Sequence, residues 1–405
     1  MEIANLEFEG FVWKVEPAWA ERLRRHILPS IARLDEDPRA RLLKKSMVRT
    51  VYRLTLPDDR QAIFKVYHLR RWRQRLKAML LGPTPLREWR VSQRLLGAGL
   101  PVSHAVAVGL PAGKTRGLEG YLVLEAAPRA VPLNEALAQR GLGHDWGSES
   151  LALVHKLAGL VRTLHDRGVW HRDLHCGNVL VRTDVWETDC PFVVVDLHRM
   201  RLSRLPHLRH KKQSIALLLR TCVFWQRWRD DLVAAFLDAY LREASPGERS
   251  ALQPSAIIRE ADRQRRRRLR SRAKRCLRNS SRFVVEEIEG WRVYRSRDYP
   301  LAELLRVVRS CPAKVADAGR LKVSVTRVRR REGGSLLEVR QYRDGLVSRV
   351  LPVGPWRPRG LTAYAAAHAE TVRSGKGPRA VAAMVGRGGE NRGRSIAIVA
   401  LEEPP

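Results

Sequence analysis

A change in hydrophobic periodicity near residue 148 constrains the fold of this 405-residue chain most strongly. Residues 44–67 alternate apolar and polar side chains around a Pro57-Asp58-Asp59 turn, which predicts two paired strands. Residues 86–96 have a helical period, and 105–108 and 121–124 are short apolar strands. From Ser148 onward we expect helices at 148–168, 214–225 and 231–243, with short strands at 179–181 and 192–195. A β-rich lobe therefore precedes a helix-rich lobe, which predicts an α+β fold.

The charge of the chain is strongly positive, with 76 Lys and Arg residues against 42 Asp and Glu residues and a net charge of +34. This excess indicates a polyanionic partner such as a membrane surface, a nucleic acid or a phosphorylated glycan. A genome that favours arginine codons would account for part of it. The basic residues are densest at 263–278, which reads either as a solvated helix face or as a polyanion contact.

The cysteines and the N-terminal residues indicate the compartment. Five scattered cysteines have no metal-ligand spacing, which fits a reducing environment without structural zinc. The first residues lack a signal-peptide pattern, and no apolar run is long enough to cross a bilayer. We therefore expect a cytoplasmic protein, soluble or peripheral to a membrane.

Residues 170–180, with the sequence WHRDLHCGNVL, carry the spacing of a kinase catalytic loop. Asp173 is expected to orient an attacking hydroxyl and accept its proton, while Asn178 would turn its amide oxygen onto Mg²⁺. Asp196 follows the apolar strand 192–195, where a carboxylate would bind Mg²⁺ that bridges the phosphates of ATP. We expect His171 and Arg172 to shape the loop rather than to react.

Nucleotide-binding residues are predicted upstream of this loop. Lys65, in the strand AIFKVY, is expected to neutralise the α- and β-phosphates of ATP, and Glu88 would hold it in place. A lysine on an exposed strand and a glutamate of any amphipathic helix would fit the same pattern. Glu125 and Ala126 follow the strand 121–124 at the expected adenine-binding hinge, where the backbone would make the hydrogen bonds.

These motifs together resemble the lipopolysaccharide kinase family of the Kdo/WaaP/InaA type, within the protein-kinase-like fold. The segments HRDLHCGNVLV, VVVDLHRMRL and FKVY carry the resemblance over roughly residues 40–245. It implies a bilobal kinase that uses ATP and Mg²⁺ to phosphorylate heptose or Kdo in the inner core of lipopolysaccharide. It further implies a lipid-linked, anionic glycan as substrate, and a peripheral location at the inner face of the inner membrane, where an anionic lipid surface would attract the basic chain.

Several positions depart from the family pattern. Residues 44–53 contain no glycine, so Ser46, Thr50 and nearby amides would have to replace a glycine-rich phosphate lid. The Asp196-Leu197-His198 tripeptide stands where kinases carry D-F-G. Some heptose kinases have histidine at the position of Asn178, so the identity of the acceptor sugar stays open.

The C-terminal part of the chain resembles a second copy of the β-rich lobe. Glu9-Gly10-Phe11 is echoed by Glu289-Gly290-Trp291, and similar pairs include Leu43-Lys44 with Leu321-Lys322 and Gly82-Pro83 with Gly354-Pro355. Arg340 stands at the lysine position and Ala363 at the glutamate position, so this copy is expected to be inactive. We therefore predict an N-lobe at 1–127, a helical lobe at 128–282 and a degenerate, truncated N-lobe-like repeat at 283–405.

Two other functions fit the sequence less well. A protein Ser/Thr kinase would carry A-P-E after Asp196, whereas here a basic stretch follows. A non-catalytic pseudokinase scaffold could bind a membrane or nucleic acid through 263–278, but it would not need to keep Lys65, Asp173, Asn178 and Asp196 together. Nucleic acid is thus an alternative partner that the motifs do not favour.

Overall fold

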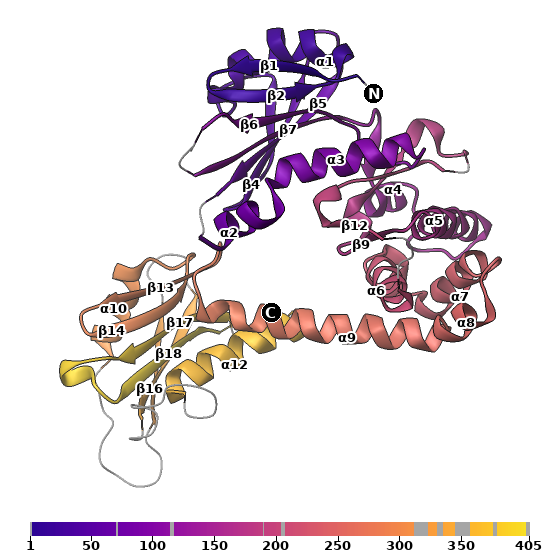
Figure 1. Cartoon of the computed structure of the whole chain (residues 1–405). Coiled ribbons are helices and arrows are strands. Elements are labelled where there is room, and N and C mark those ends of the chain that lie inside the picture. The colour runs from indigo at the N-terminus through magenta and orange to yellow at the C-terminus, as the bar shows by residue number, and fades with distance from the viewer. Residues whose placement is uncertain are drawn as a thin grey trace. The chain divides into compact units, whose positions relative to one another are not determined.

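The computed structural model describes residues 2–69, 72–113, 117–188, 190–203, 207–311, 323–329, 335–344, 357–375 and 379–401. The chain divides into two compact units, Met1–Asp262 and Arg263–Pro405, and each is described by itself (Figure 1). Mixed helix and sheet content confirms the predicted α+β composition. None of the helices in these ranges is long and apolar enough to cross a membrane.

The first unit begins with an antiparallel sheet of seven described strands. Their order across the sheet is β1-β2-β6-β7-β5-β4-β3. The strands are β1 Ala4–Phe8, β2 Phe11–Val15, β3 Ala40–Lys45, β4 Arg49–Thr55, β5 Gln61–His68, β6 Ala105–Pro111 and β7 Leu118–Glu125. The predicted strands within 44–67 are thus β4 and β5, which pair as expected. Three further strands, β1 to β3, precede them.

Two helical segments cover opposite faces of this sheet. On one face α1 (Pro17–Arg22) contributes Trp19 to a core with Trp13 and Phe64. On the other face α3 (Thr84–Gly97) buries Trp89 against Tyr67. Trp13 packs so closely on β6 that a Cβ atom at Gly109 would lie 2.6 Å from its ring, so only glycine fits there.

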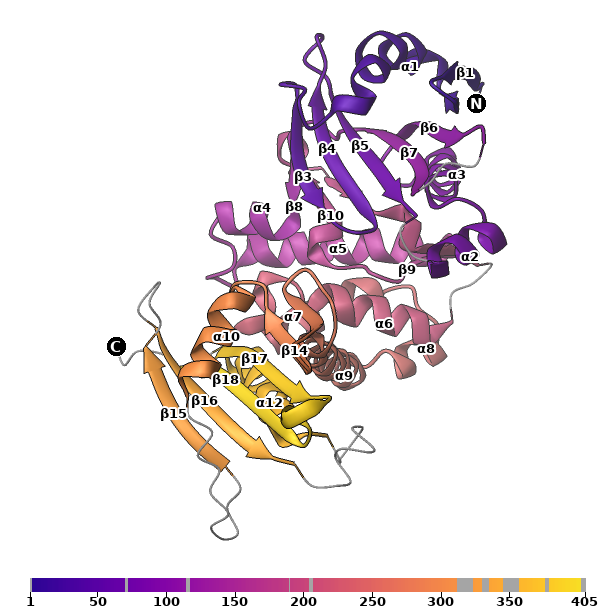
Figure 2. The ribbon, with the colours of Figure 1, turned by 90° about the vertical axis from the view of Figure 1, so that its left-hand side faces the viewer.

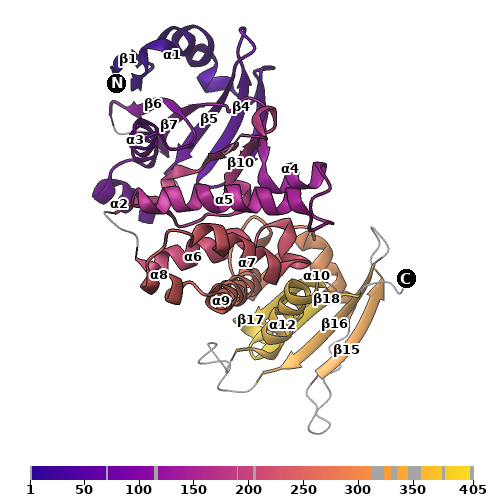
Figure 3. The same ribbon diagram turned by 90° about the vertical axis from the view of Figure 1, so that its right-hand side faces the viewer.

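The second part of this unit is helical, and it contains α4 Leu133–Gln139, α5 Ser148–Asp166, α6 Leu208–Leu219, α7 Arg229–Tyr240, α8 Pro246–Ala251 and the first part of α9 Pro254–Ala273. Helix α5 buries the predicted face of Val154, Leu157, Val161 and Leu164. It runs between the sheet on one side and helices α6 and α7 on the other (Figures 2 and 3). The helix predicted at 214–225 instead ends at Leu219 and is followed by a short 3-10 turn, Val223–Gln226.

Two small antiparallel sheets hold the loops between these helices. One has the order β11-β10-β8, made of β8 Ala130–Pro132, β10 Val179–Arg182 and β11 Phe192–Val194. The other pairs β9 (Val169–His171) with β12 (Met200–Leu202). The predicted strands at 179–181 and 192–195 are therefore present, and the segments with Asp173 and Asp196 lie between these small strands.

The second unit contains another antiparallel sheet, with six described strands in the order β13-β14-β17-β18-β16-β15. The strands are β13 Phe283–Ile288, β14 Trp291–Ser296, β15 Val323–Arg329, β16 Leu336–Arg343, β17 Arg379–Gly386 and β18 Arg394–Ala400. Helix α10 (Leu301–Ser310) packs on one face and α12 (Arg359–Ser374) on the other. In chain order, this is the strand order of the first sheet without a counterpart of β3.

The basic stretch 263–278 forms the end of α9 and a 3-10 turn, Lys274–Leu277. Its arginines are largely exposed, whereas Cys276 is fully buried beside Tyr364 in the core of the second unit. Four residues quoted for the sequence repeat, Leu321, Lys322, Gly354 and Pro355, lie outside the described residues, as do 402–405.

Candidate active site

A cavity of about 640 Å³ lies between the sheet and the helical part of the first unit. Lys65 of β5 and Arg49 of β4 line it from the sheet, and Asn178 and Asp196 line it from the helical part. Glu125, the last residue of β7, and Ala126, which follows it, complete one wall. The structure thus brings five of the nine predicted site residues to one cavity, whereas Glu88, His171, Arg172 and Asp173 are not among its lining residues.

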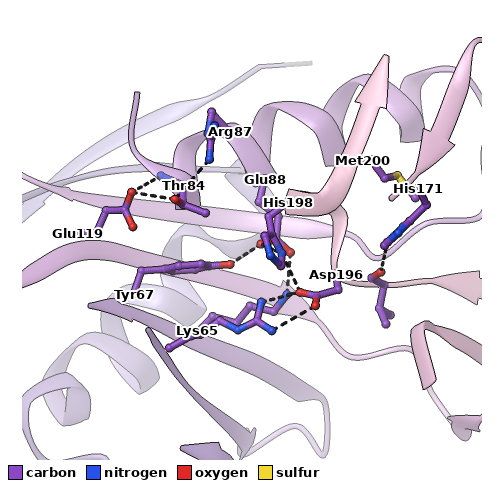
Figure 4. Close-up of polar contacts among 12 residues, drawn as sticks. Lys65, Tyr67, Thr84, Arg87, Glu88, Glu119, His171, Asp196, His198 and Met200 are labelled. Carbon is purple, nitrogen blue, oxygen red and sulfur yellow. Dashed lines mark hydrogen bonds and ion pairs between the residues drawn. The ribbon is translucent and has the colours of Figure 1, made fainter. Parts of the chain in front are cut away.

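Lys65 and Glu88 form a buried ion pair. The Lys65 ammonium group donates to Glu88 Oε1 over 2.7 Å, and the Tyr67 hydroxyl donates to Glu88 Oε2 (Figure 4). Glu88 is completely buried. Burial alone would raise the pKa of this carboxyl group, but the charge of Lys65 outweighs it and the pKa is lowered. Glu88 therefore stays ionised and fixes the lysine so that it faces the cavity.

Asp196 sits at the end of β11 in a left-handed backbone conformation, with φ of 68°. The Arg49 guanidinium group donates two hydrogen bonds to its carboxylate, of 2.5 Å to Oδ1 and 3.3 Å to Oδ2. His198 Nδ1 lies 3.0 Å from Oδ1, and Lys65 Nζ lies 3.9 Å from it. Burial raises the pKa of Asp196, but these hydrogen bonds and positive charges outweigh it and hold the pKa far below the usual value.

The loop that carries Asp173 is fixed by its neighbours. The Asp173 amide donates to His171 Nδ1 over 3.0 Å, and His171 Nε2 lies 3.2 Å from the Val195 carbonyl oxygen. His171 is 2% exposed, and burial lowers its pKa to about 4. A neutral imidazole that accepts at Nδ1 and donates at Nε2 satisfies both bonds. These two bonds fix the His171 ring within the loop that carries Asp173, and its loop-shaping role stays a prediction.

Asn178 closes the same loop. The side-chain amide nitrogen of Asn178 donates to the Asp173 carbonyl oxygen over 2.9 Å. The backbone carbonyl oxygen of Asn178 accepts from the Val195 amide over 3.0 Å. The side-chain oxygen of Asn178 is thereby left for a ligand in the cavity. Because Val195 precedes Asp196, the two predicted metal ligands are linked through one backbone hydrogen bond.

The end of β7 and the two residues after it leave one backbone amide available to a ligand. The Glu125 amide already donates to His104 and the Ala126 amide to Gln61, over 2.9 Å in each case. The next amide, that of Ala127, lines the cavity and has no hydrogen-bond partner among the described residues. The Glu125 side chain contacts His104 Nδ1 at 3.1 Å, and His104 Nε2 lies 2.7 Å from Glu16.

Several residues of the site were missed by reasoning from the sequence: Arg49, Tyr67, His198, His104 and Ala127. Arg49 belongs to the segment where Ser46 and Thr50 were expected to replace a glycine-rich lid. Instead, Ser46 bonds to the Arg49 backbone and the Thr50 hydroxyl lies 2.9 Å from His68 Nε2. No local pattern marks Arg49, because its partner is 147 residues away.

The donor set at this site fits a hard divalent cation. Asp196 supplies a carboxylate and Asn178 an amide oxygen, which are the ligand types that Mg²⁺ prefers, and both face the cavity. Glu88, Asp196 and His198 also have side-chain atoms within 4.8 Å of one another. Both oxygens of Glu88 are already bonded, to Lys65 and Tyr67, so this second group reads as a charge network.

The comparisons with known proteins match the part of the chain that builds this site. Residues 46–240 match the lipopolysaccharide kinase (Kdo/WaaP) family. The lipopolysaccharide core heptose(I) kinase WaaP of Pseudomonas aeruginosa is 28% identical over 197 residues, which cover 46% of this chain and 71% of that protein.

Two solved structures are also similar. WaaP in complex with acyl carrier protein is 23% identical, covers 63% of this chain and 98% of its own, and has a TM-score of 0.46. The PknI kinase domain of Mycobacterium tuberculosis is 16% identical, covers 56% of this chain and 96% of its own, and has a TM-score of 0.33. The family match over residues 46–240 and the WaaP relative show that this segment is similar to the lipopolysaccharide kinase (Kdo/WaaP) family, and that the chain is a phosphotransferase of the kinase type.

Proposed function

We propose that this chain transfers the γ-phosphoryl group of ATP to a hydroxyl group of a heptose or Kdo sugar in the lipopolysaccharide inner core. The observation that carries the proposal is the convergence of the Lys65–Glu88 pair, Asp196 and Asn178 on one cavity within the family segment. The related WaaP protein is a heptose kinase, which favours a sugar as acceptor.

Each residue has a distinct role in this proposal. The Ala127 amide and the backbone of Glu125 and Ala126 hold the adenine, and Lys65 neutralises the α- and β-phosphates. The carboxylate of Asp173 orients the sugar hydroxyl and accepts its proton, while His171 and Arg172 shape the loop. A phosphorus–oxygen bond to the sugar forms as the bond to the β–γ bridging oxygen breaks, and ADP leaves.

Asn178 and Asp196 would hold Mg²⁺, which supplies positive charge to the phosphates as the bonds change. The charge cluster around Asp196 also indicates what holds the site in the absence of ligands. Arg49 and Lys65 already offset the negative charge of Asp196 from two strands of the sheet. The nucleotide and the cation therefore enter a site whose side chains are positioned by hydrogen bonds on both sides.

We also propose that the three lobes are 1–127, 128–282 and 283–405, with the last a degenerate copy of the first. The common strand order and the placement of one helix on each face of each sheet support this. Arg340 of β16 pairs with Glu338 on its own strand, 2.7 Å from Nε to Oε1, rather than with a helix. The arginine is therefore held away from a lysine-like role, which supports an inactive copy.

A peripheral position at the inner face of the inner membrane follows from the proposed substrate, and helix α2 (Trp72–Leu81) supports it. Leu76, Met79 and Leu80 are 48%, 82% and 74% exposed on this helix, whose sequence has basic but no acidic residues. Exposed apolar side chains beside basic ones favour the surface of an anionic bilayer. Co-sedimentation with vesicles that contain phosphatidylglycerol should fall for Met79→Gln/Leu80→Gln and not for Leu151→Gln, a change at an exposed leucine of α5.

Phosphate transfer from labelled ATP to purified lipid-linked core acceptors of defined sugar content tests the function. We expect transfer by the wild-type protein and by Asp238→Asn, an exposed change on α7, but not by Asp173→Ala or Asp196→Asn. Equal transfer by all four proteins would end the assignment of the site. Transfer to a protein substrate with no transfer to any glycan would favour the protein-kinase alternative.

A further inference from the structure

A cluster of arginines lies beside the catalytic loop and outside the nucleotide cavity. Three of them, Arg172, Arg199 and Arg201, come from the antiparallel pair of β9 and β12 and its end. In this antiparallel pair Arg201 lies opposite Trp170, and Met200 lies opposite His171. The Arg172 amide donates to the Arg199 carbonyl oxygen over 3.2 Å, which extends the pairing by one further step.

The pleat of the strand pair places Arg201 on its exposed face. His171 and Met200 are each 2% exposed, so these two residues face the core. Side chains alternate along a strand and directly opposite residues share a face, so Trp170 and Arg201 lie on the other side. Arg172 directly follows β9 and Arg199 directly precedes β12, and all three arginines are exposed.

This arrangement sets like charges against one another. Arg172 and Arg199 are joined by a backbone hydrogen bond at the end of the strand pair, and like charges held next to each other repel. No hydrogen bond or ion pair within the described part of the chain joins any of the three to a carboxylate. Burial and the positive charges of Arg172, Arg87 and Arg199 lower the pKa of the Arg201 guanidinium. The folded protein thus holds concentrated positive charge here without an internal counter-charge.

Arg87 of α3 adds a fourth cation to the cluster. Its Nε atom is buried and has no hydrogen-bond partner within the described residues, and one of its terminal nitrogens makes only a long contact to Thr84, at 3.5 Å. A buried guanidinium nitrogen without an acceptor costs stability unless a ligand supplies one. In Figure 4 Arg87 lies apart from the Lys65–Glu88–Asp196 group.

Trp170 gives the cluster a rigid edge. Its ring stacks on His210 of α6 at a centroid distance of 3.9 Å and an interplanar angle of 2°. The Arg172 guanidinium carbon lies 5.8 Å from the Trp170 ring. The stack therefore limits where Arg172 can move and keeps its charge near the arginines of β12 and of the residue before it.

The position of the cluster indicates which ligand it meets. None of the four arginines lines the cavity that holds Lys65 and Asp196, so they do not serve the phosphates of a nucleotide in that cavity. Arg172 directly precedes Asp173, the residue assigned to the attacking hydroxyl. An anion bound by the cluster would therefore belong to the molecule that receives the phosphoryl group.

We propose that Arg87, Arg172, Arg199 and Arg201 form a subsite for an anionic group, phosphate or carboxylate, carried by the acceptor glycan next to the hydroxyl that is phosphorylated. This inference rests on the proposed function, since it assigns the acceptor side of the same site. Arginine suits this task because its planar guanidinium group binds both phosphate and carboxylate with paired hydrogen bonds.

The test measures binding and turnover separately. The probe is a deacylated inner-core oligosaccharide that carries phosphate and carboxylate groups, titrated by calorimetry into the full chain without ATP. We expect Arg199→Gln/Arg201→Gln to bind it at least about tenfold more weakly than wild type, and Arg242→Gln, at an exposed arginine after α7, to bind it normally. In turnover, the double variant should raise KM for the oligosaccharide while kcat and the affinity for an ATP analogue stay near wild type.

Two treated probes separate the chemical sources. Phosphatase treatment removes the phosphate and carboxyl reduction removes the carboxylate, and the treatment that reproduces the loss identifies the group. Equal affinity of the double variant and wild type, or no binding by wild type, would overturn the subsite. Displacement of the oligosaccharide by nucleic acid that binds the same two arginines would also overturn the subsite. Normal binding without any phosphate transfer would instead contradict the proposed function and leave the subsite standing.

Discussion

Arg49 would compete with a cation for Asp196, which we propose as a metal ligand, and its removal should therefore strengthen metal binding. The guanidinium group binds both oxygens of the carboxylate, and the two side chains are only 15% and 18% exposed. The pKa of Arg49 is raised, because the bonds and charge of Asp196 outweigh the burial that would lower it. Arg49 therefore stays charged, and a divalent cation must displace it from Asp196.

The size of the effect follows from this contact. A hydrogen bond between charged groups contributes about 1.5–3 kcal/mol. If that contribution is lost when the cation enters, Arg49→Gln should raise metal affinity by roughly ten- to hundredfold, since about 1.4 kcal/mol corresponds to a factor of ten. We expect the lower end of this range, because both side chains keep some contact with water.

The assay is the binding of Mn²⁺, followed by electron paramagnetic resonance, with a saturating non-hydrolysable ATP analogue. Arg53→Gln is the matched control, because Arg53 is on the same strand and lines the same cavity but is not bonded to Asp196. Unchanged or weaker Mn²⁺ binding by Arg49→Gln would refute the competition. An equal increase in Mn²⁺ affinity in Arg53→Gln would show a general effect of charge instead.

Three other predictions concern stability and organisation. Lys65→Met leaves Glu88 charged, buried and without its cation, so the free energy of unfolding in urea should fall by about 3–5 kcal/mol. The double variant Lys65→Met/Glu88→Gln should recover part of this stability. An unchanged free energy of unfolding in Lys65→Met would contradict the buried pair. Burial lowers the pKa of His171 to about 4 and of His165 to about 3, below the value of about 6.5 expected after unfolding. Because the unfolded chain then binds protons more readily, each histidine should lower the free energy of unfolding by about 2 kcal/mol as pH falls from 6.5 to 5. A free energy of unfolding that does not change over this range would refute the prediction. A chain that ends at Asp262 keeps the buried residues of α9, Ile257, Glu260 and Ala261, and should retain ATP turnover; complete loss would show that the first unit is not self-sufficient.

Local chemistry explains why part of the site could be predicted from the sequence. Asp173 and Asn178 are five residues apart in one loop, and Asp196 ends a short apolar strand, so their spacing alone indicates the catalytic pattern. The pairing of Lys65 with Glu88 also follows from the strand–helix order, and the structure places the two groups 2.7 Å apart. The roles of these residues in catalysis stay predictions.

The remaining contacts depend on the tertiary fold. Arg49 reaches from the sheet to Asp196 in the helical part, and His104 contacts Glu16, 88 residues away; neither pair has a sequence spacing that marks it. The strands β1 to β3 lie before the strands predicted within residues 44–67, so the sheet is larger than predicted. Helix α6 ends earlier than predicted, since apolar periodicity does not reveal that Thr221 turns its hydroxyl back to the carbonyl oxygens of Leu217 and Leu218.

The left-handed backbone at Asp196 limits which replacements evolution can use there. Among residues with a side chain, asparagine and aspartate tolerate this conformation best, and glycine adopts it freely. Descendants of this gene that abandon phosphoryl transfer should therefore drift first to asparagine or glycine at this codon, each one nucleotide away. Alanine or valine, equally close in the genetic code, would strain the turn as well as remove the carboxylate, so their presence in a homologue would mark a rebuilt loop rather than a silenced enzyme.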